Sequence, residues 1–189
     1  MSFEIKSMTN INEGIEEILI THEELIKRIE EVGKEISKDY VGKNPLLIAL
    51  LKGSVPFLSE LLNSIYIPME YECVKVSSYC GTKSTGCVTI EGLNKLSIEN
   101  RNLIIIEDIV DSGLTIQKTI EALNEYHPAS IEVATLLDKP SMRQIENIHP
   151  KYICFKIPNK FVVGFGLDFN QQFRNLPYVG VLKPTMYME

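Results

Sequence analysis

Three short, largely apolar runs limit the fold of this chain more than any other feature of its sequence. They cover residues 46–51, 103–106 and 131–137, and each is too short to form a free-standing helix. Runs of this kind are typical of strands buried on both faces, as in a parallel sheet that helices cover. Helical periodicity appears between them, in the spacing of Phe57, Leu58, Leu61 and Leu62 and again of Ile116, Ile120 and Leu123. The alternation predicts an open α/β sheet, mostly parallel and flanked by helices, with right-handed crossovers.

The segment 21–40 predicts an amphipathic helix ahead of the first of these strands. Its apolar residues fall on one stripe, formed by Leu25, Ile29, Val32 and Ile36. Thr21 followed by Glu24 has the spacing of a capping box, in which each side chain bonds the other residue's backbone amide. Pro45 prevents the helix from continuing into the strand.

Composition excludes several classes of protein. With 44% hydrophobic and 23% charged residues the chain is globular, and no apolar run approaches the ~20 residues of a membrane span. The net charge of −6 argues against binding to nucleic acid or to an anionic membrane. The start shows no secretory signal and the four cysteines show no CxxC pairing, which favours reduced thiols and a cytoplasmic location. We therefore expect one domain over residues 1–189, with no nucleic-acid or membrane partner.

The most informative segment is 103–115, which reads LIIIEDIVDSGLT. It leads from a buried strand through Glu107 and Asp108 into the turn Asp111-Ser112-Gly113, which opens a helix. Unpaired amides at a helix start can hold a phosphate, and the two acids suit sugar hydroxyls or Mg²⁺. The alternative is an ordinary helix capped by Asp111 or Ser112, with both acids merely exposed. The segment is neither a Walker A loop nor a GxGxxG turn.

The whole run resembles the signature of the phosphoribosyltransferase family, an apolar strand and two acids followed by an Asp-[Ser/Thr]-Gly-x-Thr loop. The resemblance implies a type I phosphoribosyltransferase-like core with a small hood formed by segments from the two chain ends. It also implies that the loop holds the 5-phosphate of 5-phospho-α-D-ribosyl 1-diphosphate, through Asp111, Ser112, Gly113, Leu114 and Thr115. Many relatives have a lysine where Leu114 stands, so one cation near the phosphate is absent.

Further segments resemble the members of the family that act on 6-oxopurines, in the family's order. Lys52 and Gly53 match the loop that receives the diphosphate, often with a cis bond between Leu51 and Lys52. The segment 76–86 matches a loop that closes over the site, led by Ser78 and Tyr79. Taken alone, the first would be a surface lysine beside a glycine and the second an ordinary hairpin tip.

The resemblance places the purine between the third strand and the C-terminal segment. Lys139 donates to the oxygen at purine position 6, Phe161 stacks on the base, and Lys160 and the Val162 backbone border it. Asp168 lies beside the base and holds a second Mg²⁺, and Arg174 grips the diphosphate. Without the resemblance, Lys139 would be read as solvated and Phe161 as core. Asn159 replaces a common aspartate here.

The activity implied is transfer of the phosphoribosyl group to N9 of hypoxanthine or guanine, giving IMP or GMP and diphosphate, in purine salvage. Glu107, Asp108 and Asp168 are the metal ligands implied, and Mg²⁺, Lys52 and Arg174 neutralise the leaving group. Asp111 accepts the proton from purine N7 as general base.

Other functions stay open at this point. Within the family these are an enzyme that prefers xanthine or accepts any 6-oxopurine, or a nucleotide-sensing regulator without activity. A flavodoxin-like or receiver-like domain would leave Lys139, Phe161 and Arg174 without a role. The resemblance also implies a homodimer or homotetramer whose small-molecule substrates are the base and the diphosphate sugar.

Overall fold

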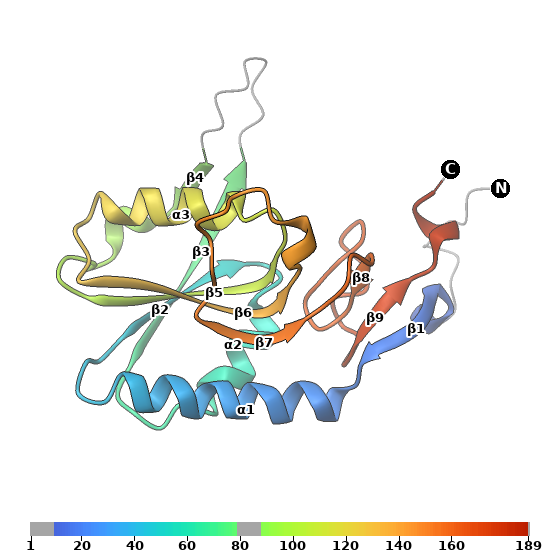
Figure 1. Cartoon of the computed structure of the whole chain (residues 1–189), viewed down its shortest axis with the longest axis horizontal. Helices are drawn as coiled ribbons and strands as arrows, with labels where there is room; N and C mark the ends of the chain where they lie inside the picture. Colours follow the sequence, from blue (N-terminus) through green and yellow to red (C-terminus); the bar gives the residue numbers. More distant parts are fainter. Residues whose placement is uncertain (1–9, 79–87, 189) are drawn as a thin grey trace, which may run out of the picture.

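A six-stranded sheet forms the centre of the computed structural model, which describes residues 10–78 and 88–188 (Figure 1). Its strand order is β4-β3-β2-β5-β6-β7, and β4, at one edge, is the only antiparallel strand of this sheet. The first strand of the chain, β1, lies outside this sheet. The strands are β2 (Leu46–Leu51), β3 (Glu70–Ser78), β4 (Val88–Glu91), β5 (Asn102–Val110), β6 (Ser130–Asp138) and β7 (Tyr152–Lys156). The mostly parallel sheet predicted from the apolar runs is confirmed.

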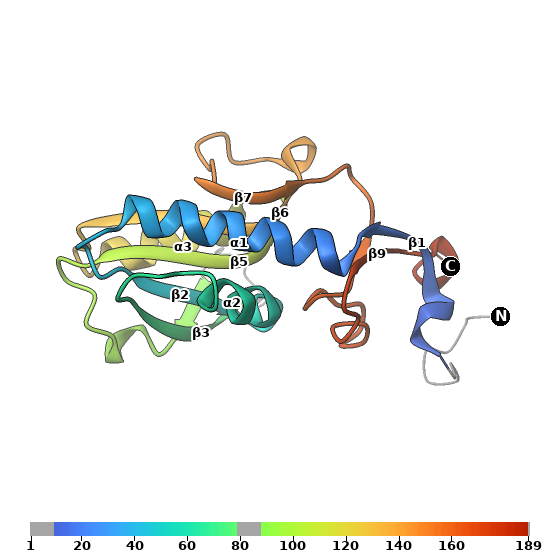
Figure 2. The same ribbon diagram turned by 90° about the horizontal axis from the view of Figure 1, so that it is seen from below.

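Helices cover both faces of this sheet, as Figures 1 and 2 show. On one face lie α1 (His22–Asp39) and α2 (Val55–Leu62), and on the other lies α3 (Leu114–Asn124). Successive residues of a strand point to opposite faces, so Ile104 packs toward α1 and α2 while Ile105 packs toward α3. Burial on both sides explains why β2 and residues 103–106 of β5 are continuously apolar.

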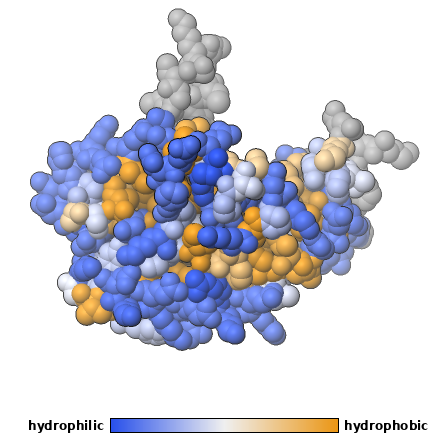
Figure 3. Space-filling model, in the orientation of Figure 1, coloured by the Kyte–Doolittle hydropathy of each residue, from blue (hydrophilic) through white to orange (hydrophobic). Residues whose placement is uncertain are grey.

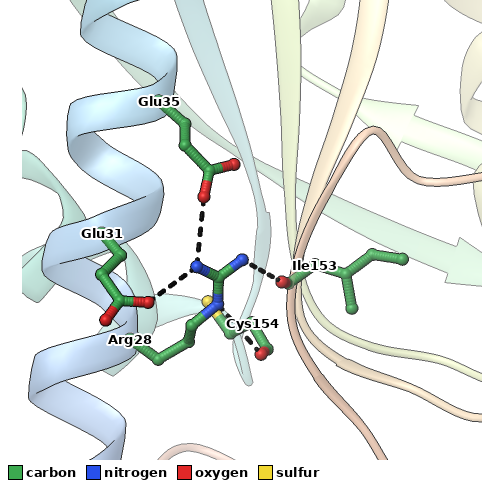
Figure 4. A network of polar contacts seen from close by, with 5 residues as sticks. All are labelled: Arg28, Glu31, Glu35, Ile153 and Cys154. Atoms are coloured by element: carbon green, nitrogen blue, oxygen red, sulfur yellow. Dashed lines mark hydrogen bonds and ion pairs between the residues drawn. The ribbon is translucent and has the colours of Figure 1, made fainter.

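The helix α1 begins as its sequence predicts. The Thr21 hydroxyl accepts from the Glu24 amide at 3.4 Å, and the Glu24 carboxylate accepts from the Thr21 amide at 2.8 Å. The helix ends at Asp39, before Pro45. Arg28 fixes its outer side to the edge strand β7 (Figure 4): the guanidinium donates to the carbonyls of Ile153 and Cys154. Covering an edge strand in this way satisfies carbonyls that would otherwise face solvent.

A second, three-stranded sheet forms a hood beside the first, built from both ends of the chain. It contains β1 (Ile15–Ile20), β9 (Val179–Leu182) and β8 (Val162–Val163), all antiparallel. Its small core contains Val163, Phe173, Leu176 and Leu182. On the face drawn in Figure 3 the surface is mostly hydrophilic, and apolar residues gather at the junction of sheet and hood. The hood implied by the resemblance is confirmed.

The strand order places a switch point between β2 and β5. The chain moves from β2 to one side through α2 and from β5 to the other side through α3, so the loops that follow these strands diverge. Ligands of open α/β sheets bind in such a crevice, at the carboxyl ends of the strands. The hood lies beside this edge of the sheet, and Val162 of β8 lines a cavity there together with Asp108 of β5.

The structure bears on two expectations from composition, the absence of a membrane span and the state of the cysteines. Within residues 10–78 and 88–188, no helix is long and apolar enough to cross a membrane. The cysteines in this part of the chain, Cys73 and Cys154, are free, and burial raises the pKa of the Cys154 thiol to about 12. The assignment of residues 1–189 to one domain stays a prediction.

Candidate active site

A cavity of about 550 Å³ lies at the carboxyl edge of the sheet, under the hood. Its walls come from the ends of β5 and β6, from the segment leading into β8, and from the end of the chain. The predicted general base, Asp111, lines it, together with most of the residues predicted to hold the purine and the metal, namely Asp108, Lys139, Lys160, Phe161, Val162 and Asp168. Asn159 lines it as well.

The predicted phosphate loop has free amides at the start of α3. Gly113 precedes the helix with a φ of +85° and provides no side-chain cap, and the first backbone bond runs from Gln117 back to Gly113. The Ser112 hydroxyl reaches only the Leu114 amide, at 3.3 Å. Across the described residues, the amides of Gly113, Thr115 and Ile116 have no hydrogen-bond partner. A helix start of this kind attracts an anion, through the amides and the helix dipole.

Arg143 supports the back of this loop, a role that the sequence reasoning missed. Its guanidinium donates to the Asp111 carbonyl at 2.9 Å and forms an ion pair with the buried Asp138. The amides of Gln144 and Ile145 donate to the Ser112 carbonyl at 3.0 and 3.1 Å. The segment after β6 thus fixes the loop after β5. The available signal was an arginine four positions after Lys139, in the same strand-end motif.

Lys139 and Asp111 lie side by side in the lining of the cavity. The Lys139 side chain is buried, and its Nζ lies 3.7 Å from Oδ1 of Asp111, whose own side chain is half exposed. The Lys139 amide donates to the Val110 carbonyl at 3.0 Å, so the two strand ends hold the pair in register. One hydrogen-bond donor and one proton acceptor therefore border the same space.

The two adjacent acids of β5 have different environments. Asp108 lines the cavity, and burial raises the pKa of its carboxyl to about 6, although bonds from backbone amides lower it. Glu107 does not line the cavity; its Oε2 is shielded from solvent without a hydrogen-bond partner in the described part of the chain. Burial, followed by the charge of Asp108, raises the pKa of Glu107 well above its usual value. Of the two acids, Asp108 therefore lines the cavity, whereas Glu107 is buried next to it and does not.

The predicted diphosphate loop lies against Asp108. A Cβ atom on Gly53 would lie 1.6 Å from Oδ2 of Asp108, so only glycine fits there. The peptide bond between Leu51 and Lys52 is cis, as the resemblance implies. The Lys52 side chain is exposed and has no ion-pair partner among the residues that the structure describes. This cation is free to meet an anion.

Asp168 and Arg174 form an ion pair at the floor of the hood. Arg174 Nη2 lies 2.7 Å from Oδ1 of Asp168, and its Nη1 donates to the Gly166 carbonyl at 2.7 Å. Arg174 does not line the cavity itself, but its charge lowers the pKa of Asp108. Arg174, which was predicted to bind the diphosphate, therefore lies close to the acids of the site and is paired with one of them, Asp168.

The predicted purine wall lies on the hood side. Phe161 is 39% exposed, and its carbonyl accepts from the Leu182 amide at 2.9 Å. The backbone of Val162 is paired with Val181 of β9. Lys160 forms an ion pair with Glu17 of β1. Ile109 and Leu167 add apolar surface to the same cavity, and the sequence reasoning had named neither as a site residue.

One predicted element falls largely outside the described residues. β3 ends at Ser78, which is opposite Val88 of β4 in an antiparallel pair. Tyr79 and the rest of the loop to residue 87 lie outside the described residues. Closure of this loop over the site stays a prediction.

The fold and this cavity together define a class of protein. The family model for the phosphoribosyl transferase domain matches residues 15–170, and the chain belongs to the phosphoribosyltransferase family. The curated relatives include the hypoxanthine-guanine phosphoribosyltransferase of Lactococcus lactis subsp. lactis, 47% identical over 179 residues that cover 94% of this chain and 97% of the relative. That of Streptococcus pneumoniae strain R6 is 43% identical over 178 residues, covering 94% and 98%.

Solved structures agree with these sequence relatives. A hypoxanthine phosphoribosyltransferase from Staphylococcus aureus superimposes with a TM-score of 0.89 at 41% identity, covering 97% of this chain and all of the other. The chain is thus similar over nearly its whole length to members of the family that act on 6-oxopurines.

Proposed function

We propose that this chain transfers the 5-phosphoribosyl group from 5-phospho-α-D-ribosyl 1-diphosphate to N9 of hypoxanthine and guanine, giving IMP or GMP in purine salvage. The observation that carries the proposal is one cavity lined by a buried donor, Lys139, by the partly exposed ring of Phe161 and by Asp111, the residue at which the loop with unpaired amides begins. These features match a 6-oxo group, a flat base and a phosphate, respectively. The similarity to hypoxanthine-guanine phosphoribosyltransferases over nearly the whole chain supports the same reaction.

Lys139 is proposed to select the base. Its ammonium can only donate, so it accepts an oxo group at position 6 and faces an adenine amino group donor to donor. A buried donor left unpaired is costly, which favours hypoxanthine and guanine over adenine. Phe161 supplies the stacking surface and the Val162 backbone borders the base edge. Lys160 is held by Glu17, so its proposed contact to the base needs that ion pair to open or to be shared.

Asp111 is proposed to act as general base at N7. Its carboxylate is half exposed at the cavity and adjoins the phosphate loop that fixes the sugar. Accepting the N7 proton as N9 attacks the sugar keeps the base neutral, and the same carboxyl returns the proton in the reverse reaction.

A divalent metal, proposed to be Mg²⁺, fits the acids of the cavity. Mg²⁺ is usually held by one or two carboxylates together with substrate phosphates and water. Asp108 and Asp168 both line the cavity, and no cluster of three or more ligating side chains occurs in the described ranges. When bound, the metal neutralises charge on the diphosphate leaving group. Lys52 and Arg174 add positive charge beside it, and Glu107 would need to rotate to take part.

The loop closure, the assembly and the location complete the proposal. Closure by the loop led by Ser78 and Tyr79 would exclude water from the cation-like sugar during transfer. We also propose a homodimer or homotetramer, a cytoplasmic location and one domain over 1–189, by likeness to the family. Size-exclusion chromatography with light scattering measures the assembly directly.

The test is an assay of the purified protein with hypoxanthine, guanine, xanthine and adenine, each with the diphosphate sugar and Mg²⁺. We expect IMP and GMP from the first two and little product from adenine. A dominant xanthine activity would shift the substrate assignment within the family. Binding of the diphosphate sugar without turnover on any base would favour a nucleotide-sensing regulator and contradict the enzyme.

A further inference from the structure

Tyr187, near the end of the chain, lines the same cavity as Phe161 and has no part in the reaction proposed above. It follows the short turn Pro184–Met186. Its ring stacks on that of Phe161, with ring centroids 4.8 Å apart and an angle of 22° between the planes. Phe161 also contacts Phe169 in a nearly perpendicular arrangement, with ring centroids 5.6 Å apart and 88° between the planes. Three aromatic rings thus form one cluster at the wall of the base pocket.

Of the two stacked rings, Tyr187 is the anchored one. It is half-buried and packs against the hood core of Val163, Phe173, Leu176 and Leu182. Phe161 belongs to none of the buried clusters in the described chain and stays 39% exposed. The exposed part of Phe161 therefore faces away from its aromatic neighbours. A purine cannot enter between the two rings. Their centroids are 4.8 Å apart, and a base stacked between them would need about twice the ~4.5 Å spacing of one stacked pair.

The backbone around Tyr187 is tied to the beginning of the chain. The Lys183 amide donates to the Gly14 carbonyl at 2.9 Å, and the Lys183 ammonium donates to the Glu13 carbonyl at 2.7 Å. The Tyr187 amide then donates to the Pro184 carbonyl at 3.2 Å and closes the turn. These bonds hold the ring where it meets Phe161. The Tyr187 hydroxyl has no hydrogen-bond partner within the described residues, so the ring alone makes the contact.

We propose that Tyr187 is a positioning residue for the base: it supports the ring of Phe161 from behind, so that the opposite face is ready to stack on the purine. The inference rests on the proposed function, because it assigns the exposed face of Phe161 to a purine. Without the support, Phe161 would have more rotamers open to it, and binding would have to fix its ring at an entropic cost. The effect falls on the base and leaves the diphosphate sugar, bound by other loops, unchanged.

The experiment compares Tyr187→Ala, Tyr187→Leu and Tyr187→Phe with wild-type protein, and Met188→Ala is the matched control. Met188 is the next residue and is 64% exposed, so it tests the loss of any side chain at the chain end. We expect the KM for hypoxanthine to rise about 3- to 10-fold in the Ala and Leu variants, the range of one aromatic contact. The KM for the diphosphate sugar and kcat should stay the same, and Tyr187→Phe should match wild type. Tyr187→Leu keeps apolar volume in the hood, and thermal unfolding checks that it folds.

Several results would overturn this role for Tyr187. An unchanged KM for hypoxanthine in Tyr187→Leu would remove it, and a lowered KM would mean that the ring obstructs the base. An equal rise in KM for hypoxanthine and for the diphosphate sugar, together with a lowered kcat, would indicate only a structural role. Wild-type activity is measured first. If it is absent on all four bases, the proposed function fails and this inference fails with it, whereas an active wild type beside unaltered variants refutes the inference alone.

Discussion

Asp108 is predicted to destabilise the substrate-free protein at neutral pH, and Asp108→Asn should therefore stabilise it. Burial raises the pKa of this carboxyl from 3.8 to about 6 in the folded chain. Between these two values the folded state binds more protons than the unfolded state, so stability falls as the pH rises through that window. Above about pH 6 the carboxylate is ionised in both states and the loss is complete.

The magnitude follows from the difference between the two pKa values. They differ by about two, and each pKa unit corresponds to ~1.4 kcal/mol, which gives about 3 kcal/mol at pH 7. Asp108 retains some contact with solvent, so about 3 kcal/mol is an upper bound. Asparagine has the shape of the protonated acid and can accept the Ile109 amide, which now bonds the Asp108 carboxylate at 2.9 Å. The substitution thus removes the charge with little change in packing.

The assay is urea unfolding of wild type and Asp108→Asn between pH 4 and 7.5, with EDTA and without substrates. The two proteins should be similar near pH 4, and the variant should become more stable as the pH rises. Glu72→Gln, at an exposed position on β3, controls for the loss of one negative charge. A difference that stays constant from pH 4 to 7.5, or a variant less stable than wild type at pH 7, would refute the reasoning. Added Mg²⁺ and diphosphate sugar should stabilise wild type more than the variant, because the variant lacks a metal ligand.

Three predictions concern turnover. Asp111→Asn should keep binding of the diphosphate sugar while kcat falls ~10²-fold or more, as steady-state kinetics and titration measure, and near wild-type kcat would remove Asp111 from the base role. Lys139→Met leaves the 6-oxo group without a charged donor, so the KM for hypoxanthine should rise ~10-fold or more and the preference over adenine should shrink; an unchanged preference would place selection elsewhere. EDTA should abolish turnover and excess Mg²⁺ should restore it, whereas substantial activity in EDTA would contradict the proposed metal.

The central strands β2, β5 and β6 could be predicted from the sequence because much of each is buried on both faces. Their apolar runs are short, and the capping box at Thr21 marks the helix start locally. Strand β5 extends to Val110, beyond the apolar run that ends at Ile106. Its last residues carry the acids of the site, which interrupt the apolar pattern where function replaces packing.

The hood could be expected only from the resemblance. Its strands β1, β8 and β9 are short and pair across most of the chain, as in the contact of Ile15 with Leu182. Such pairing leaves no local period in the sequence, and β8 is only two residues long. The support that Arg143 gives to the phosphate loop was missed for a similar reason. Its partners are the backbone of Asp111 and the buried Asp138, and neither contact can be read from residue types along the chain.

The charges of the site explain how an acidic protein can bind a polyanion. The chain has a net charge of −6, yet three cations at the cavity or beside it are each paired with a carboxylate: Lys139 with Asp111, Lys160 with Glu17, and Arg174 with Asp168. These pairs keep the cations in place and limit self-repulsion before substrate arrives. If the diphosphate draws Arg174 away, Asp168 becomes an unpaired carboxylate in the same cavity as Asp108. Two unpaired carboxylates in one cavity favour the binding of a cation between them. A divalent metal that arrives with the diphosphate meets this demand, so we expect the two to bind as a complex.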